Sequence, residues 1–146
     1  MIRNLQQEDI TKVMTIWTKG NFTAHDFIEK DYWLENFNKV KNFYLPNSDT
    51  YVYVENEEIE GFISIAEKNH IGALFVKQQY QRKGIGRKLI NYCKEKYNSL
   101  DLNVYDKNGN AIAFYMAMGF KNVGVQIDEN TGEKEYIMEW KVEDLK

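Results

Sequence analysis

The sequence is poor in the residues that form disulfide frameworks and metal clusters. It has one cysteine, Cys93, and two histidines, His25 and His70, which stand far apart in the chain. A single cysteine cannot form an internal disulfide, and Cys93 falls on the inward face of an expected helix, so we expect a buried thiol in a reduced, cytoplasmic protein. No group of residues has metal-ligand spacing, and we expect no bound metal.

The chain also lacks a long uncharged apolar run and a strong net charge. We therefore expect no membrane span and no signal peptide. The net charge of −3 argues against a general nucleic-acid binder. Because 43% of the residues are hydrophobic and 14% are aromatic, a chain of this length is expected to form one folded domain, residues 1–146.

Two helices are expected before the first long strands. The first has its apolar face within residues 10–17 and is expected to end at Gly20. The second lies within residues 21–44, with Thr23 or Asp26 as its N-cap.

The second helix has an aromatic face and a proline boundary. We expect the only proline, Pro46, to end the helix by restricting Leu45. Its inward face is predicted to carry Trp33, Phe37, Val40 and Tyr44.

Strand patterns occupy most of the remaining chain. They cover residues 2–5, 51–54, 59–66, 70–76, 100–104, 121–127 and 135–140. Two further helices are expected, one that follows the glycine-containing segment 81–86 and reaches residue 97, and one over residues 108–118 that Gly119 ends. The order of these elements predicts an α+β fold with a mixed sheet.

A glycine loop with four neighbouring cations lies between the apolar strand 73–76 and the next helix. It contains Gln81, Arg82, Lys83, Gly84, Ile85 and Gly86, followed by Arg87 and Lys88. Unpaired N–H groups at a helix N-terminus suit phosphate oxygens, and nearby cations add positive charge. The loop lacks the third glycine of the dinucleotide fingerprint and the Gly-Lys-Ser/Thr of the Walker pattern. It predicts a pyrophosphate site, with an ordinary glycine turn as the alternative.

Two motifs resemble those of the GNAT superfamily of acetyl-CoA-dependent N-acetyltransferases. The first, Gln81-x-x-Gly84-x-Gly86, is similar to the family's Arg/Gln-x-x-Gly-x-Gly/Ala signature. The second, Asn108-x-x-Ala111-x-x-Phe114-Tyr115-x-x-x-Gly119-Phe120, resembles its last helix and the strand that follows. The element order matches as well, so the resemblance spans nearly the whole chain. Within the family, Trp17, His25-x-Phe27 and the Tyr32-Trp33 pair resemble the small stand-alone bacterial members. It implies a mixed, mostly antiparallel sheet of about seven strands with about four helices on both faces.

The resemblance also implies where acetyl-CoA binds. Main-chain groups of Leu74, Phe75 and Val76 would hold the pantetheine, and an N–H near Val76 would stabilise the thioester oxygen by roughly 3–4 kcal/mol. Asn108 would hold the cosubstrate near the same point, and the pyrophosphate would be wrapped by Gln81, Arg82, Lys83, Gly84, Ile85, Gly86 and Arg87. Tyr115 would protonate the departing thiolate as general acid, since a phenol has a pKa near 10; ordinary aromatic packing is its alternative role.

The proton acceptor is left open. Many relatives carry Glu where this chain has Asn103, and an amide can orient groups but cannot serve as a base. His70, at the start of the cofactor strand, is the candidate base or water relay, because an unperturbed imidazole has a pKa near 6.5; a merely structural role at the strand end is the alternative. Glu67 and Asp101 are weaker candidates.

The resemblance further implies that the first two helices build the acceptor pocket. His25, Trp33 and Asn103 are predicted to lie there together with Tyr44, although His25 could instead cap a helix. The acceptor is a protein lysine, an N-terminal amine or a small amine. A catalytically weak CoA-binding sensor or interaction module is the alternative function. The protein is expected to be a monomer or a homodimer without nucleic-acid or membrane partners.

Overall fold

The computed structural model describes residues 1–145, so Lys146, the last residue of the expected domain, lies outside the described part. Its strands are β1 (Ile2–Asn4), β2 (Asp49–Glu55), β3 (Glu58–Ala66), β4 (His70–Val76), β5 (Ser99–Tyr105), β6 (Lys121–Ile127) and β7 (Lys134–Lys141). Its α-helices are α1 (Ile10–Ala24), α2 (Lys30–Lys39), α3 (Ile85–Lys96) and α4 (Gly109–Ala117). Short 3-10 turns cover Gln7–Asp9, Gln78–Tyr80 and Val142–Leu145, and a π-helical segment covers Val40–Tyr44.

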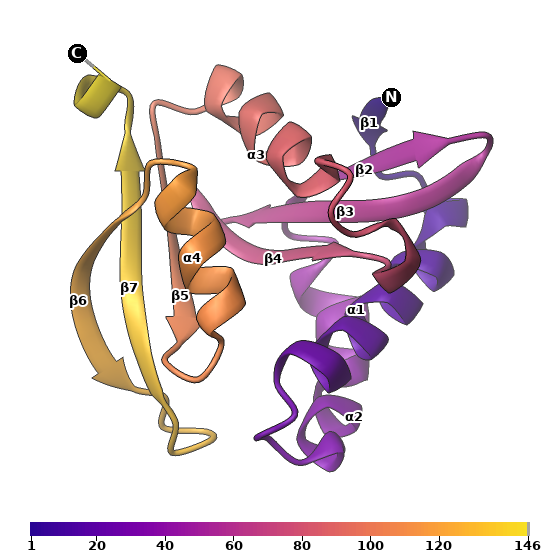
Figure 1. Ribbon diagram of the computed structural model, residues 1–146. Coiled ribbons are helices and arrows are strands. Elements are labelled where there is room, and N and C mark those ends of the chain that lie inside the picture. Colours follow the sequence, from indigo (N-terminus) through magenta and orange to yellow (C-terminus); the bar gives the residue numbers. More distant parts are fainter. Residues whose placement is uncertain (146) are drawn as a thin grey trace.

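The strands form one mixed sheet in the order β1-β2-β3-β4-β5-β7-β6. Every pairing is antiparallel except β4 with β5, which is parallel. The predicted α+β fold, with a mostly antiparallel sheet and four helices, is confirmed. Figure 1 shows that β2, β3 and β4 run across the picture, whereas β5, β6 and β7 run steeply, so the two halves of the sheet diverge.

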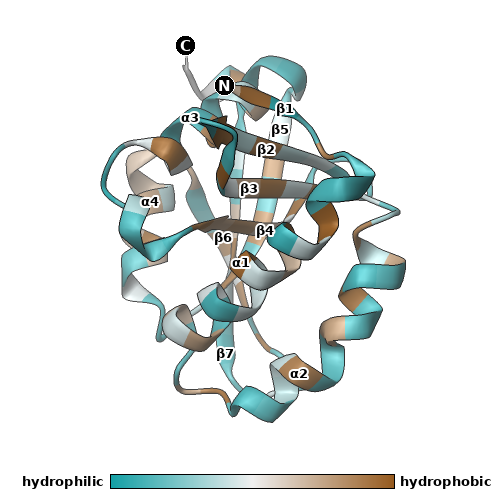
Figure 2. Cartoon of the chain, turned by 90° about the vertical axis from the view of Figure 1, so that its right-hand side faces the viewer, coloured by the Kyte–Doolittle hydropathy of each residue, from teal (hydrophilic) through white to brown (hydrophobic). Residues whose placement is uncertain are grey.

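The helices cover both faces of the sheet. One core cluster joins α3 and α4 to the strands, and a second joins α1 and α2 to the opposite face of β2 and β3. In Figure 2 the hydrophobic residues concentrate on the inner strands, while the outer helical surfaces are largely hydrophilic. Cys93 is fully buried on α3, and this burial raises the pKa of its thiol to about 12, as the inward face predicted.

Gly20 does not end the first helix, as the sequence had suggested. It lies inside α1, which continues to Ala24. A Cβ at Gly20 would stand 2.3 Å from Cδ1 of Phe75 on β4. The glycine therefore allows a close approach of α1 to the central strand, and its role is packing rather than helix termination.

The second helix also differs from the prediction at its ends. It begins at Lys30, and neither Thr23 nor Asp26 caps it, because Glu29 occupies the N-cap without a side-chain hydrogen bond. Leu45 keeps right-handed helical dihedrals, so Pro46 does not act by restricting it. The helix still ends there, where proline has no N–H to continue the ladder.

A π-turn alters the predicted aromatic face. The Leu45 N–H bonds to the Val40 carbonyl at 2.8 Å, a five-residue step that adds rotation to the last turn. Trp33, in the regular part of the helix, is buried, whereas Tyr44, in the π segment, is 47% exposed and carries Lys39 over its ring. Tyr44 is therefore not on the inward face that the sequence predicted.

Candidate active site

The divergence of β4 and β5 leaves a wedge in the centre of the sheet. Within residues 1–145 the two strands pair at a single register position, His70 with Asp101. Beyond it they separate, as Figure 1 shows. The edge of β4 that faces β5 thus presents main-chain N–H and C=O groups without strand partners from Gly72 to Val76, where a ligand can accept and donate hydrogen bonds.

A β-bulge at Gly72 accompanies this separation. Ile65 pairs with Ile71 and Ser64 with Ala73, so Gly72 is the extra residue. The bulge reverses the alternation of β4: Ile71 packs in the α3/α4 cluster, and Ala73 packs on the α1 side. Bulges bend strands and occur next to active sites. Sequence reasoning overlooked Gly72, although an isolated glycine inside a strand pattern is a signal for a bulge.

The glycine loop forms the N-terminus of α3 at the open end of the wedge. Gly84 is the N-cap, with φ of 83° and no side-chain cap, and a Cβ there would meet nothing within 4 Å. Its backbone conformation is what requires glycine. The first helical bond runs from the Lys88 N–H to the Gly84 carbonyl, which leaves the N–H groups of residues 85–87 without helical acceptors.

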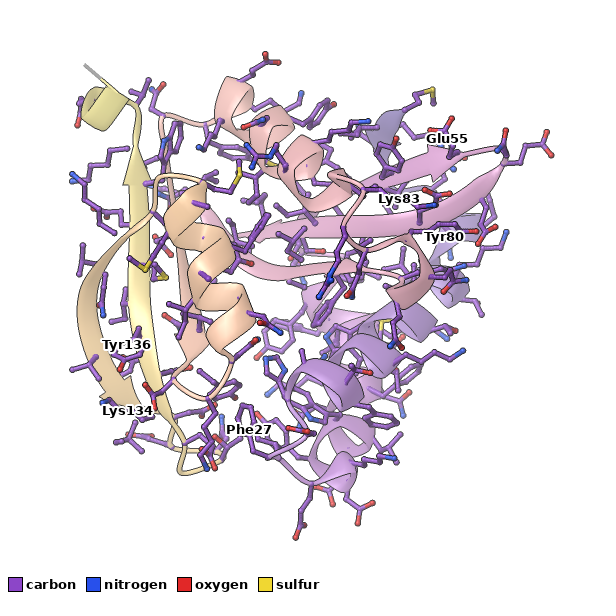
Figure 3. The ribbon with its side chains drawn as sticks, viewed as in Figure 1. Phe27, Glu55, Tyr80, Lys83, Lys134 and Tyr136 are labelled. Carbon is purple, nitrogen blue, oxygen red and sulfur yellow. The ribbon has the colours of Figure 1, made fainter. Side chains whose placement is uncertain are left out.

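The other loop side chains differ in whether they bind to the rest of the protein. The Gln81 amide donates to the Val76 carbonyl at 3.1 Å and so fixes the loop to the end of β4. Lys83 lies 5.4 Å from the ring centre of Tyr80, and Figure 3 shows the two side chains together. Arg82, in a left-handed conformation with φ of 66°, and Arg87 form no ion pair with a described side chain.

Gly86 connects the loop to the second motif. A Cβ at this position would lie 3.3 Å from Cζ of Phe114, so the glycine lets α3 pack closely against α4. Tyr115 follows Phe114 and packs edge-on against Phe114 and Phe120. Its burial raises the pKa of the phenol, and its hydroxyl makes no hydrogen bond to another described residue. The Tyr115 hydroxyl is therefore protonated, and its O–H can be donated to a ligand.

His25 and Asn108 bring the two sides of the wedge into contact. The Nε2 of His25 lies 3.3 Å from the Nδ2 of Asn108, the N-cap of α4. The His25 ring also stacks on Trp33 at 5.4 Å and meets Tyr105 edge-on at 5.1 Å. Burial lowers the pKa of His25 to about 4, so the imidazole is neutral at pH 7. Of the predicted acceptor residues, the structure brings His25 and Trp33 together.

The two other predicted site residues lie on β4 and β5. His70 is at the closed end of the wedge, at the opposite end of β4 from Val76, and its Nδ1 is 2.5 Å from the Oδ1 of Asp101. Asn103 is exposed on the face of β5 that also carries Asp101 and Tyr105.

Two carboxylates, those of Asp128 and Glu135, lie close to α2 and to the last residue of β5. The Tyr105 hydroxyl donates to Asp128 at 2.6 Å, and Glu135, which is only 8% exposed, accepts from Gln126 at 2.7 Å. Burial, and then the charges of Asp128 and Glu135, raise the pKa of Tyr32 on α2. Asp128 and Glu135 therefore place negative charge close to Tyr32, and the Lys107 ammonium lies 5.6 Å from the ring centre of Phe27, which contacts Tyr105.

No helix within residues 1–145 is long and apolar enough to cross a membrane. Among these residues, no three or more histidine, cysteine, aspartate or glutamate side chains are grouped so as to hold a metal ion.

The arrangement suits transfer of an acyl group from a long phosphorylated donor. It combines an unpaired strand edge, a helix N-terminus with N–H groups that lack helical acceptors, and a buried phenol. Two carboxylates lie beside α2.

Known proteins resemble this chain in sequence and in fold. Residues 10–141 match the family model for the acetyltransferase (GNAT) domain. The chain is 34% identical over 142 residues to the peptidyl-lysine N-acetyltransferase YiaC of Escherichia coli K12, with 97% of both chains covered. It is 31% identical over 124 residues to the E. coli peptidyl-lysine N-acetyltransferase YjaB, which covers 84% of this chain and 83% of YjaB. The solution structure of apo-form YjaB from E. coli has a TM-score of 0.83 at 26% identity, over 96% of both chains.

Proposed function

The chain belongs to the GNAT family of acetyltransferases, and we propose that it transfers the acetyl group of acetyl-CoA to the side-chain amine of a peptidyl lysine. The observation that carries this proposal is the unpaired edge of β4 beside a helix N-terminus that is open to an anion. The names of the two bacterial relatives support lysine as the acceptor.

The residues around the wedge fit acetyl-CoA. Main-chain groups of Leu74, Phe75 and Val76 would bind the pantetheine arm, and the N–H groups of residues 85–87 would bind the pyrophosphate, with Arg82 and Arg87 adding charge. A Cβ at Gly84 would meet no protein atom, so the loop backbone is open to a phosphate. The bound thioester supplies an activated acetyl group.

Tyr115 is the proposed general acid. Acetyl transfer to an amine forms a C–N bond, breaks the C–S bond and leaves a thiolate that needs a proton. The buried phenol stays protonated at neutral pH, because burial raises its pKa, and its hydroxyl has no competing partner in the described structure. It can therefore donate to the sulfur as negative charge develops there.

The acceptor lysine is proposed to enter past the carboxylates of Asp128 and Glu135, beside α2. Asp128 and Glu135 would attract the ammonium group, and Trp33 and Tyr105 would line its aliphatic stem. An ordinary lysine amine is neutral in only about one molecule in 2,500 at pH 7, so a base must remove a proton before attack. Asn103, on the same sheet face, would orient the acceptor.

His70 is the proposed base, acting directly or through a water molecule. The Asp101 carboxylate holds its Nδ1, which leaves Nε2 to accept the proton. Because His70 lies at the closed end of the wedge, a water relay is the simpler route to an amine that enters at the other end.

The acceptor class can be tested with three kinds of amine: a lysine side chain, a peptide N-terminus and a small polyamine. The protein is incubated with acetyl-CoA and a lysine peptide with a blocked N-terminus, an arginine peptide with a free N-terminus, or spermidine, and thiol release and peptide mass are recorded. We expect acetylation of the lysine peptide. Acetylation of the free N-terminus or of spermidine alone would contradict the lysine proposal, and binding of acetyl-CoA without transfer would indicate a sensor.

A further inference from the structure

The hydrogen bonds around His25 determine which ring nitrogen carries its proton. The Asn21 amide nitrogen donates to the Trp17 carbonyl at 3.0 Å. The Asn21 Oδ1 lies 2.8 Å from the Nδ1 of His25 and can only accept. His25 therefore carries its proton on Nδ1, and its Nε2 presents a lone pair.

The hydrogen bonds of Asn108 determine which group faces the Nε2 lone pair of His25. The Asn108 Oδ1 accepts the Ala111 N–H at 3.3 Å, as the N-cap of α4, so the amide nitrogen of Asn108 is the atom that faces His25. An N–H of Asn108 thus donates to the His25 Nε2 at 3.3 Å. The chain of bonds runs from the C-terminal part of α1 to the start of α4, and each bond in it pairs a donor with an acceptor.

Packing holds the imidazole in this orientation. It stacks on Trp33, meets Phe27 and Tyr105 edge-on, and is neutral. Figure 3 shows Phe27 between the α1–α2 segment and the lower ends of β6 and β7, on the acceptor side. The Nε2 lone pair of His25 therefore lies between the proposed acceptor path and Asn108. In the free protein it accepts the Asn108 N–H.

We propose that the His25–Asn108 contact couples acetyl-CoA binding to amine binding. When the Asn108 amide turns to the cosubstrate, its bond to His25 breaks, and the free Nε2 accepts an N–H from the incoming amine. Acetyl-CoA then raises the affinity for the amine, and the amine raises the affinity for acetyl-CoA by the same factor. The inference rests on the proposed function, because it takes Asn108 as a cosubstrate ligand.

The test measures lysine-peptide affinity by calorimetry, with and without a saturating thioether analogue of acetyl-CoA that cannot react. We expect the wild type to bind the peptide at least about fivefold more tightly with the analogue. His25→Phe keeps the ring on Trp33 but has no lone pair. It should lose the enhancement, and it should bind the analogue at least as tightly as the wild type, because no bond to Asn108 has to break. His25→Gln can offer an amide oxygen near the Nε2 position and should recover part of it.

Failure of the coupling can be told apart from failure of the proposed function. If the analogue and the peptide both bind and turnover proceeds, but wild-type peptide affinity is unchanged by the analogue, the coupling is wrong. It is also wrong if His25→Phe keeps the full enhancement, or if nitrogen NMR of the free protein finds the proton on Nε2. If the analogue does not bind at all, it is the proposed function that fails.

Discussion

The imidazole of His70 and the carboxylate of Asp101 join β4 to β5 where the wedge begins, with 2.5 Å between Nδ1 and Oδ1. Both side chains are about one-third exposed, so the pair is open to water. The carboxylate orients the ring and fixes the nitrogen that faces away from it. A pair of this kind can serve as a base, or it can simply tie the two strands together.

Replacement of each partner separates these two roles. His70→Ala should lower kcat/KM by about 100-fold and flatten the fall in rate at acid pH, because that fall reports protonation of the base. Asp101→Asn should lower the rate by about 10-fold, since the ring keeps its lone pair but loses its orientation. The measurement is thiol release across a pH series. A pH profile that is unchanged in His70→Ala would exclude His70 as the base.

Tyr115→Phe should separate chemistry from stability. The hydroxyl makes no hydrogen bond within the described structure, so its removal should change the melting temperature little. The loss of a proton donor should lower kcat by about 100-fold or more. Thiol release and thermal unfolding are measured on the same preparation. Unchanged turnover would rule out the acid role. A large drop in melting temperature would contradict the prediction that the hydroxyl does not stabilise the fold, and the rate loss would then reflect a change in the fold.

Gly84→Ala tests the anion-binding loop against a matched control. Gly84 and Gly132 both have positive φ and open space around the missing Cβ, so alanine should cost about 1 kcal/mol of stability at either site. Only Gly84 begins α3, so only Gly84→Ala should also weaken acetyl-CoA binding, as measured by calorimetry. Equal acetyl-CoA affinities in the two variants would argue against the loop as the pyrophosphate site.

His25 should make the stability of the fold depend on pH. Its folded pKa of about 4 is depressed by burial from about 6.5 in an unfolded chain, so the unfolded state binds the proton first as the pH falls. Between pH 7 and pH 5 the wild type should lose about 2 kcal/mol more unfolding free energy than His25→Phe, which has no group to titrate there. Urea unfolding at both pH values measures the difference, and equal losses would show that His25 is not held neutral.

Regular periodicity made most of the fold predictable. The strands and α3 carry simple hydrophobic patterns, and the loop and α4 motifs identified the family. The errors lie where contacts across the chain decide the outcome. Gly20 resembles a helix stop, yet its missing Cβ is required by Phe75 on a distant strand. The π-turn that exposes Tyr44 has no periodic signal, because one extra residue per turn is a property of packing rather than composition.

The site was predictable in its parts but not in its connections. The glycine loop before α3 could be predicted from the sequence, and its binding of acetyl-CoA stays a prediction. The single β4–β5 register pair and the bulge at Gly72 depend instead on how the strands meet. The His25–Asn108 contact joins residues 83 positions apart, and only the tertiary structure can reveal it. The roles of His70, Tyr115 and Asn103 stay predictions.

Amide hydrogen exchange with and without acetyl-CoA tests the account most directly, because it locates the ligand without relying on turnover. We predict that acetyl-CoA slows exchange at the β4 amides of residues 73–76 that face β5 and at the α3 amides of residues 85–87, where the free structure offers no strand or helix acceptor. Slowed exchange elsewhere, with these two segments unchanged, would contradict the placement of acetyl-CoA in the wedge.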